Sequence, residues 1–276
     1  MDIIQAIIIG LVQGLTEFLP VSSSSHLVFI QQILGVSEPL AFDVLLHLGT
    51  LIAVISYFWR DIIQMIIAFF SSLIDLFKGR FISEIKKDPY KKLTWYVIIA
   101  TIPVGIIGYL FNSTIESVFT GISIPAFFLL VTGFILYFSQ RMNSGEINLK
   151  NMGLKETILI GCSQACALLP GLSRSGTTLA VGLFLGLDKE FAAKFSFILS
   201  IPVILAAAIY ELKDVSLGGS VELTAWITGF IVAVISGYLA IKFLLKLIEE
   251  RNLDIFAYYC WIVGAIILVG SLAFGL

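Results

Sequence analysis

The chain has 276 residues, of which 58% are hydrophobic and 13% are charged, and its mean hydropathy is +1.01. Soluble domains carry about 25% charged residues, so this composition excludes a water-soluble globule. The net charge of −2 comes without the large basic patch that nucleic-acid binding needs. We therefore expect an all-α integral membrane protein with no nucleic-acid partner.

The first apolar stretch, residues 3–34, is interrupted by Pro20 and the serine run Ser22–Ser25, and a later one, residues 156–187, is interrupted at 169–176. Each half is too short, or too polar at its end, to span a bilayer. Non-helical backbone at membrane depth persists only where protein or a water-filled cavity surrounds it. Both stretches are therefore predicted to be re-entrant helix–loop–helix hairpins. The first stretch lacks the basic leader and cleavage site of a signal peptide, so we expect it in the mature protein.

Six other apolar runs approach or reach the length of about 17 to 25 residues that crosses a bilayer as a helix. The predicted transmembrane helices are Val44–Trp59, Leu93–Phe111, Val118–Phe138, Phe191–Tyr210, Leu223–Leu245 and Ile255–Phe274. Small residues within them are expected at close helix contacts, namely Gly105, Gly108, Gly133, Gly229 and Gly237. The three cysteines, Cys162, Cys166 and Cys260, lack the partners of a zinc or redox site and are interpreted as small hydrophobes within the membrane.

Positive charge predicts the orientation, because loops rich in Lys and Arg stay in the cytoplasm. No Lys or Arg precedes Arg60, so the N-terminus and the first hairpin are expected outside. The segments expected inside are Lys78–Lys92, Arg141–Lys155, Lys189–Lys194 and Lys242–Arg251. Besides the N-terminus and the first hairpin, the segments expected outside are Asn112–Ser117, Glu211–Val221 and the C-terminus. The two hairpins would then enter from opposite faces.

The hairpins also resemble each other, since Gln13 lies seven residues before Pro20, Gln164 lies six before Pro170, and a serine-rich turn follows each proline. Similar segments of opposite orientation indicate an inverted-topology repeat, whose broken helices meet near the midplane and build a site. We predict one membrane domain, 1–276, made of repeats 1–145 and 146–276. Chance similarity between two Ser/Pro turns is the alternative.

The first hairpin carries three candidate site residues. Gln13 and Glu17 share a helix face, and an ionisable residue such as Glu17 inside a membrane is by default functional. His26 ends the serine run, and imidazole is well suited to move protons near neutral pH. The alternatives are a Glu17 exposed to headgroups and a His26 that is only a satisfied polar residue.

Arg174 is the most informative residue of the second hairpin. It follows Pro170-Gly171-Leu172-Ser173 and precedes Ser175-Gly176-Thr177-Thr178 and an apolar helix, so free N–H groups at the helix start face the turn. A guanidinium among such donors can clamp phosphate or carboxylate. A structural ion pair with Glu17 is the alternative, and it too would bring the hairpins together. The sequence predicts a phosphate site in the membrane, without the glycine-rich loop that binds ATP.

The run from Gln13 to His26, together with Pro170–Gly176, closely resembles the two signature regions of the bacterial undecaprenyl-diphosphate phosphatases, the bacitracin-resistance family. The resemblance implies hydrolysis of a long-chain isoprenoid diphosphate to the monophosphate and phosphate in the bacterial inner membrane. The active site would open to the outer face, and the reaction would recycle the lipid carrier for cell-wall synthesis. Bacitracin would compete for the same substrate, and homodimer formation is left open.

The resemblance also implies residue roles. Glu17, Ser23, His26 and Arg174 would be catalytic, Glu17 and Gln13 would hold a divalent cation, Mg²⁺ or Ca²⁺, and Arg174, Gly171, Ser173, Ser175 and Thr178 would bind the substrate. Many members have Glu at the position of Gln13, and Gln keeps an oxygen ligand but removes one negative charge. His26 would be either the nucleophile or a general base acting on water or Ser23. Asp43 and His47, four residues apart, are expected to make helix-end contacts rather than to take part in catalysis.

A secondary transporter or lipid flippase is the competing interpretation, because inverted repeats with broken helices also occur there. Arg174 would then bind a substrate without hydrolysis, and His26 would couple protons. A purely structural membrane protein is a third reading, and it leaves Glu17 and Arg174 unexplained.

Overall fold

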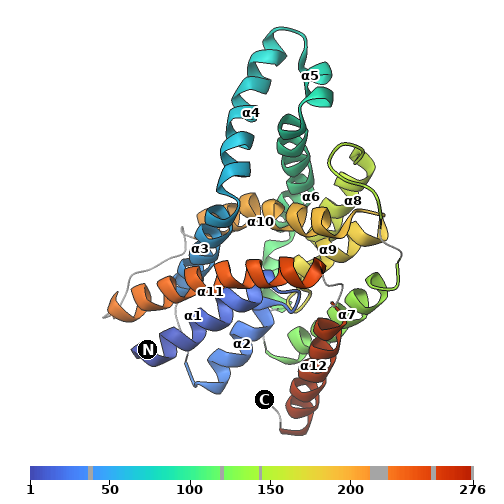
Figure 1. The fold of residues 1–276 in the computed structure, drawn as a ribbon. Coiled ribbons are helices and arrows are strands. Elements are labelled where there is room, and N and C mark those ends of the chain that lie inside the picture. Colours follow the sequence, from blue (N-terminus) through green and yellow to red (C-terminus); the bar gives the residue numbers. More distant parts are fainter. Residues whose placement is uncertain (37–39, 119–120, 143–144, 212–222, 250–252, 275–276) are drawn as a thin grey trace.

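The computed structural model describes residues 1–36, 40–118, 121–142, 145–211, 223–249 and 253–274, and all its regular elements there are helices (Figure 1). They are α1 (Ile3–Phe18), α2 (Ser23–Ile33), α3 (Leu40–Tyr57), α4 (Trp59–Phe77), α5 (Phe81–Lys87), α6 (Pro89–Val118), α7 (Ser123–Ser139), α8 (Leu154–Cys166), α9 (Arg174–Phe184), α10 (Lys189–Glu211), α11 (Leu223–Glu249) and α12 (Asp254–Phe274). The all-α prediction is confirmed for the described residues.

Both predicted hairpins are present as pairs of helices joined by a short turn, α1 with α2 and α8 with α9. Leu19 is extended (φ −66°, ψ 143°), as expected of a residue that precedes proline, and so α1 ends there. Ser22 has a left-handed φ of 66°, and its hydroxyl caps α2. Ser173 caps α9 by accepting a hydrogen bond from the Gly176 N–H. The serine-rich turns therefore begin the second helix of each hairpin.

The protein is a multi-pass membrane protein. Among the described residues, four helices are long and apolar enough to cross a bilayer, namely α10, α11, α12 and the Pro89–Phe111 part of α6. α3 and α4 qualify only as one pair, bent by 87°, and α7 is shorter, with 17 residues. Length and composition thus support four or five of the six predicted spans. Four predicted segments lie partly outside the described residues, namely Val118–Phe138, Arg141–Lys155, Glu211–Val221 and Lys242–Arg251.

The hairpin formed by α4, α5 and the start of α6 extends away from the remaining helices (Figure 1). The sequence analysis did not predict α4, whose apolar face lies opposite Asp61 and Asp75. Lys91 of α6 forms a buried ion pair with Asp75, and Thr94 donates to the Met65 carbonyl oxygen. These contacts fasten α4 to α6 within a largely apolar region.

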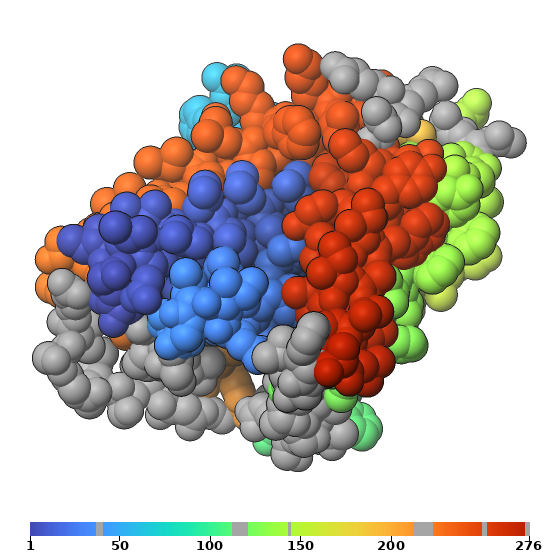
Figure 2. All heavy atoms as spheres, turned by 90° about the horizontal axis from the view of Figure 1, so that it is seen from below, coloured from blue at the N-terminus to red at the C-terminus, as the bar shows by residue number. Residues whose placement is uncertain are grey.

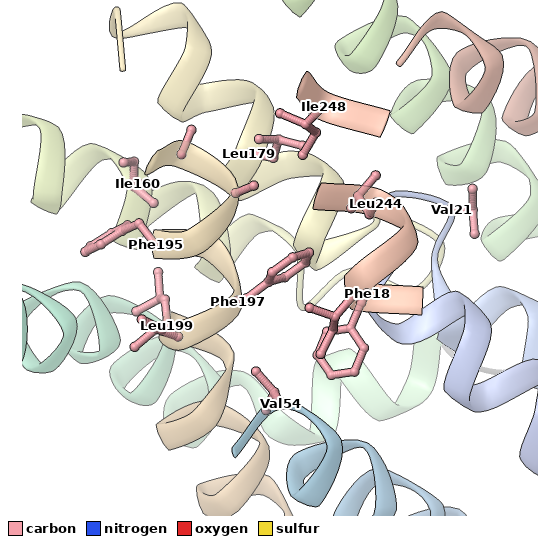
Figure 3. Close-up of a cluster of buried hydrophobic side chains, with 14 of the residues drawn as sticks. Phe18, Val21, Val54, Ile160, Leu179, Phe195, Phe197, Leu199, Leu244 and Ile248 are labelled. Carbon is pink, nitrogen blue, oxygen red and sulfur yellow. The ribbon is translucent and has the colours of Figure 1, made fainter. Parts of the chain in front are cut away.

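The apolar core holds the end of the first hairpin in place. Phe18, the last residue of α1, is fully buried and packs edge-on against Phe197 of α10, with ring centroids 5.6 Å apart. Figure 3 shows Val54 of α3 beside this pair. On the face seen in Figure 2, α12 lies next to α1 and α2. The turn after Phe18 is therefore fixed between α10 and α12.

Glycines allow α1 and α11 to approach closely. A Cβ at Gly14 would overlap the Ser236 hydroxyl and lie 2.7 Å from the Ala233 carbonyl oxygen, and a Cβ at Gly10 would overlap the carbonyl of Gly229. The predicted close contacts are confirmed for Gly133, Gly229 and Gly237. The prediction is wrong for Gly105, which has open space around it, and Gly108 makes only an ordinary contact with Leu168.

We predict that Gly14→Ala destabilises the protein while Gly105→Ala does not. The new methyl group at position 14 would push α1 off α11, and overpacking of this kind costs about 1–3 kcal/mol. At Gly105 the methyl group enters open space and favours the helix by up to about 1 kcal/mol. Thermal unfolding of both variants in the same detergent measures the difference, and equal midpoints would show that the helices are not in close contact.

Candidate functional site

The turns of the two hairpins meet. The Ser175 hydroxyl donates to the Leu19 carbonyl oxygen at 3.1 Å, and a Cβ at Gly176 would lie 3.2 Å from the Pro20 side chain. At this junction Arg174 Nη2 donates to Glu17 Oε1 at 2.8 Å, and both side chains are largely buried. The predicted convergence of one carboxylate and one guanidinium from the two hairpins is therefore present in the structure.

The second oxygen of Glu17 gathers the other polar groups of the first hairpin. Glu17 Oε2 accepts a 2.7 Å hydrogen bond from the Ser23 hydroxyl and a 3.0 Å bond from Gln13 Nε2. His47 Nε2 of α3 lies 3.9 Å from the same oxygen. A buried carboxylate is tolerated only when it is paired and hydrogen-bonded, and Glu17 meets that requirement on both oxygens.

Two polar atoms beside this carboxylate are buried but lack a hydrogen-bond partner in the part of the chain that the structure describes. They are Nη1 of Arg174 and Oε1 of Gln13. A buried polar atom without a partner costs about 1–3 kcal/mol, so such atoms are rare and require an explanation. Here they offer a charged donor for an anion and an oxygen for a cation, next to the same carboxylate.

The other predicted residues of the second hairpin shape its turn. Gly171 has φ +98°, and a Cβ there would overlap the Pro125 carbonyl oxygen of α7. Ser173 Oγ lies 3.2 Å from Ser175 Oγ. Thr178 donates to the Arg174 carbonyl oxygen within α9 and lies 2.6 Å from the Ser196 hydroxyl. These hydroxyls already have protein partners and hold the backbone around Arg174.

His26 faces α12. A carbonyl oxygen can only accept, so His26 Nδ1 donates to Ser22 O at 2.8 Å, and Nε2 of the neutral ring accepts from the Tyr259 hydroxyl at 2.8 Å. The two rings are stacked, with centroids 5.6 Å apart. The Ser23 hydroxyl, which could have been a partner of His26, is instead bonded to Glu17. The structure thus brings Ser23 to the carboxylate and His26 to Tyr259.

Three residues of this region lie on α7, α12 and α3. The sequence analysis named no site residue on α7 or α12, and on α3 it expected only helix-end contacts. Thr132 of α7 accepts from the Ser173 N–H at 3.0 Å and donates to the Gly171 carbonyl oxygen at 3.2 Å. Tyr259 holds His26, and His47 faces Glu17. His47 also makes the expected helix-end contact, from Nδ1 to the Asp43 carbonyl oxygen. No local motif marks Thr132 or Tyr259, because each is an isolated polar residue on an apolar helix.

The residues fit a divalent cation only in part. The described residues contain no group of three His, Cys, Asp or Glu side chains that could hold a metal ion. The buried, unpartnered Gln13 Oε1 beside Glu17 does fit such an ion, because hard cations bind amide and carboxylate oxygens. Any cation here therefore depends on an amide oxygen as well as on the carboxylate.

The three cysteines differ in exposure. Cys260 is buried, whereas Cys162 and Cys166 are exposed on α8.

Comparison with known proteins identifies the class. Residues 6–266 match the family model of the bacitracin resistance protein BacA. The chain is 65% identical to a Methanobrevibacter smithii protein named undecaprenyl-diphosphatase, over 99% of both chains. Proteins of the same name from Methanosphaera stadtmanae and Halothermothrix orenii are 47% and 41% identical over 98% of this chain, with 99% and 98% of their own lengths covered. The chain belongs to the BacA family of membrane proteins.

We predict that Thr132→Val loosens the second hairpin turn. Valine has nearly the shape of threonine but leaves the Ser173 N–H and the Gly171 carbonyl oxygen without their partner, at a cost of about 1–3 kcal/mol. Thr101→Val is the matched control, because the Thr101 hydroxyl bonds only within its own helix, to Val97 O. Thermal unfolding of both variants checks this, and equal stability would mean that Thr132 does not support the turn.

Proposed function

We propose that the protein hydrolyses undecaprenyl diphosphate to undecaprenyl phosphate and inorganic phosphate. The observation that carries this proposal is the contact between Glu17 and Arg174 from opposite hairpins, beside a buried and unpartnered Arg174 Nη1. An anion clamp next to a carboxylate suits a diphosphate better than a neutral substrate. The names of the relatives favour hydrolysis over the transporter alternative.

In this mechanism Arg174 binds the diphosphate. Nη1 and the N–H groups at the start of α9 take phosphate oxygens and offset the charge that develops when the bridging P–O bond breaks. Ser173 and Ser175 keep the backbone of the turn in position through their own hydrogen bonds. Positioning and electrostatic stabilisation provide most of the catalysis in phosphoryl transfer.

Glu17 and Gln13 would hold a divalent cation, Mg²⁺ or Ca²⁺ among the hard ions. When bound by these two side chains, such a cation would offset the charge of the phosphate oxygens. Glu17 also takes the Ser23 hydroxyl as a donor, which keeps that hydroxyl oriented beside the carboxylate. The loss of a charge at Gln13, relative to a glutamate, would weaken cation binding.

His26 would act as a general base on water through Nε2. The Nδ1 bond to Ser22 O fixes the tautomer and leaves the basic lone pair at Nε2, where Tyr259 orients it. The hydroxyl of Tyr259 must release Nε2 before that atom can accept a proton. Tyr259 therefore belongs to the same proton-handling unit.

For this role of His26 we predict that no phosphorylated enzyme accumulates. Reactions with labelled isoprenoid diphosphate, quenched separately in acid and in base, should contain free phosphate and no labelled protein. A base-stable, acid-labile phosphoprotein would indicate a histidine nucleophile instead, and an acid-stable one would point to Ser23.

For the topology we propose six transmembrane helices and two oppositely inserted re-entrant hairpins in an inverted repeat. The helix contacts support a two-fold arrangement in which α1, α2, α3, α6 and α7 correspond to α8, α9, α10, α11 and α12. α1 packs on α11 as α8 packs on α6, and α3 and α7 each contact their own counterpart. α7 contacts α9, as α2 meets α12 through His26 and Tyr259. α4 and α5 have no counterpart among the described residues.

The proposed orientation puts the site on the outer face of the inner membrane, where it would recycle the carrier lipid of cell-wall synthesis. Bacitracin would compete for the diphosphate there. The membrane lipid itself surrounds the exposed apolar side chains, such as Ile4, Phe70 and Leu272.

We predict that Arg174→Lys and Glu17→Gln each lower kcat/KM by about 10²–10³. Lysine keeps the charge but loses the planar fork, and glutamine removes the negative charge that pairs with the guanidinium. Arg141→Lys is the control, because Arg141 also pairs with a carboxylate, that of Asp254, and is half-exposed away from the hairpins. Phosphate release from purified protein and a long-chain isoprenoid diphosphate measures the effect, and activity at the control level in both site variants would refute the site.

A further inference from the structure

We propose that Gln164 of α8 is a further substrate-binding residue, which holds a phosphate group together with Arg174. In the second hairpin this phosphate group would lie where the Glu17 carboxylate lies in the first. The inference rests on the proposed function, since it takes the phosphate to be that of the lipid diphosphate. It gives a role to a side chain that the sequence analysis used only to compare the two hairpins.

The two hairpins match residue by residue when the starts of their second helices are aligned. Gln13 lies ten residues before Ser23, the first residue of α2. Gln164 lies ten residues before Arg174, the first residue of α9. In both hairpins the residue directly before that start is a serine that caps the helix. Gln13 and Gln164 therefore occupy equivalent positions.

The packing of α1 and α8 supports this correspondence. Each glutamine lies three residues after a glycine that touches the backbone of another helix. A Cβ at Gly10 would overlap the Gly229 carbonyl of α11, and a Cβ at Gly161 would overlap the Ala100 carbonyl of α6. The buried positions over these stretches also coincide, namely Ala6, Ile9, Gly10, Gln13 and Gly14 in α1 and Thr157, Ile160, Gly161, Gln164 and Ala165 in α8.

In the first hairpin a carboxylate joins the glutamine to the start of the second helix. Glu17 Oε2 accepts from Gln13 Nε2 at 3.0 Å and from the Ser23 hydroxyl at 2.7 Å. The amide nitrogen and the hydroxyl thus converge on one anionic oxygen. The backbone arrangement that the two hairpins share therefore accommodates an oxygen anion between these two positions.

The second hairpin has no such carboxylate of its own. Leu168 stands at the position equivalent to Glu17, and its side chain contacts Gly108 of α6. Arg174 reaches the Glu17 of the other hairpin with Nη2. Its Nη1 and both amide atoms of Gln164 are buried and have no hydrogen-bond partner among the described residues. An anionic oxygen between these two side chains would have to come from a ligand.

A phosphate group matches the polar atoms of the second hairpin. Among the described residues, four buried atoms of this hairpin lack a partner, namely Gln164 Nε2, Gln164 Oε1, Arg174 Nη1 and Thr177 Oγ1, against Gln13 Oε1 alone in the first. This imbalance favours a ligand on the Arg174 side. The guanidinium and the amide nitrogen donate to phosphate oxygens, and a phosphate that carries one proton also donates to the amide oxygen. Sulfate has a similar shape but carries no proton near neutral pH.

Gln164→Met tests the inference, because methionine keeps the unbranched shape of glutamine and loses the amide. Removing buried polar atoms without partners should raise the thermal unfolding midpoint of the purified full-length protein in detergent. The affinity for inorganic phosphate, measured from the rise of the midpoint with phosphate concentration, should fall about 10- to 100-fold, as for a lost hydrogen bond to a charged group. kcat/KM for a long-chain isoprenoid diphosphate should fall by a similar factor.

Thr157→Val is the matched control. Thr157 lies on the same buried face of α8, and its hydroxyl already donates to the Gly153 carbonyl oxygen at 2.9 Å. This variant should not raise the midpoint, and its phosphate affinity and kcat/KM should equal those of the wild type. Sodium sulfate at equal concentration corrects for the general stabilisation that both salts give.

A midpoint that stays the same or falls in Gln164→Met would show that the amide has a structural role, and it overturns the inference. So does a phosphate affinity equal to that of the control, or a wild type that binds phosphate no better than sulfate. Phosphate release by the wild type decides the proposed function separately. If the wild type hydrolyses the lipid and Gln164→Met keeps its kcat/KM, only the role of Gln164 is refuted.

Discussion

The ion pair between Glu17 and Arg174 is the interaction on which the remaining structure of the site depends. Two charges within an apolar bundle are stable only when each has a partner and further hydrogen bonds. Glu17 has both, with Arg174 on one oxygen and Ser23 and Gln13 on the other. Because the two charges come from different halves of the chain, neither hairpin can satisfy its own charge, and the two turns must meet.

Small residues make that meeting geometrically possible. Gly176 lets the start of α9 approach Pro20, and Gly171 lets the second turn lie against Pro125 of α7. The Ser25 hydroxyl of the first hairpin donates to the same Pro125 carbonyl oxygen, at 3.3 Å. The beginning of α7 is thus a common support for both turns, and it fixes their separation without contributing a charge.

The sequence predicts the parts of this arrangement that are local. Pro20 and the 169–176 segment interrupt apolar runs, so both hairpins and their turns can be located, and the presence of Glu17 and Arg174 in a membrane already suggests that they pair. Contacts between helices across the bundle could not be predicted from the sequence. Tyr259 and Thr132 lie on helices whose composition only indicates lipid or core, and their roles follow from helix rotation and packing that no single run of residues encodes. α4 was missed because its polar residues interrupt the apolar run that a search for spans requires.

Two of the buried polar atoms without partners among the described residues lie beside the Glu17 carboxylate, where they favour a role in binding. If the pair of Glu17 and Arg174 served only to join the hairpins, Arg174 Nη1 and Gln13 Oε1 would be expected to find protein partners, since each unsatisfied atom costs about 1–3 kcal/mol. Hydroxyls are abundant nearby, yet those of Ser175 and Thr178 bond to Leu19 O and Arg174 O instead. A diphosphate oxygen at Nη1 and a cation at Oε1 would recover that energy on binding. Under the proposed function, the free energy withheld from folding would be available to hold a charged headgroup within the apolar bundle.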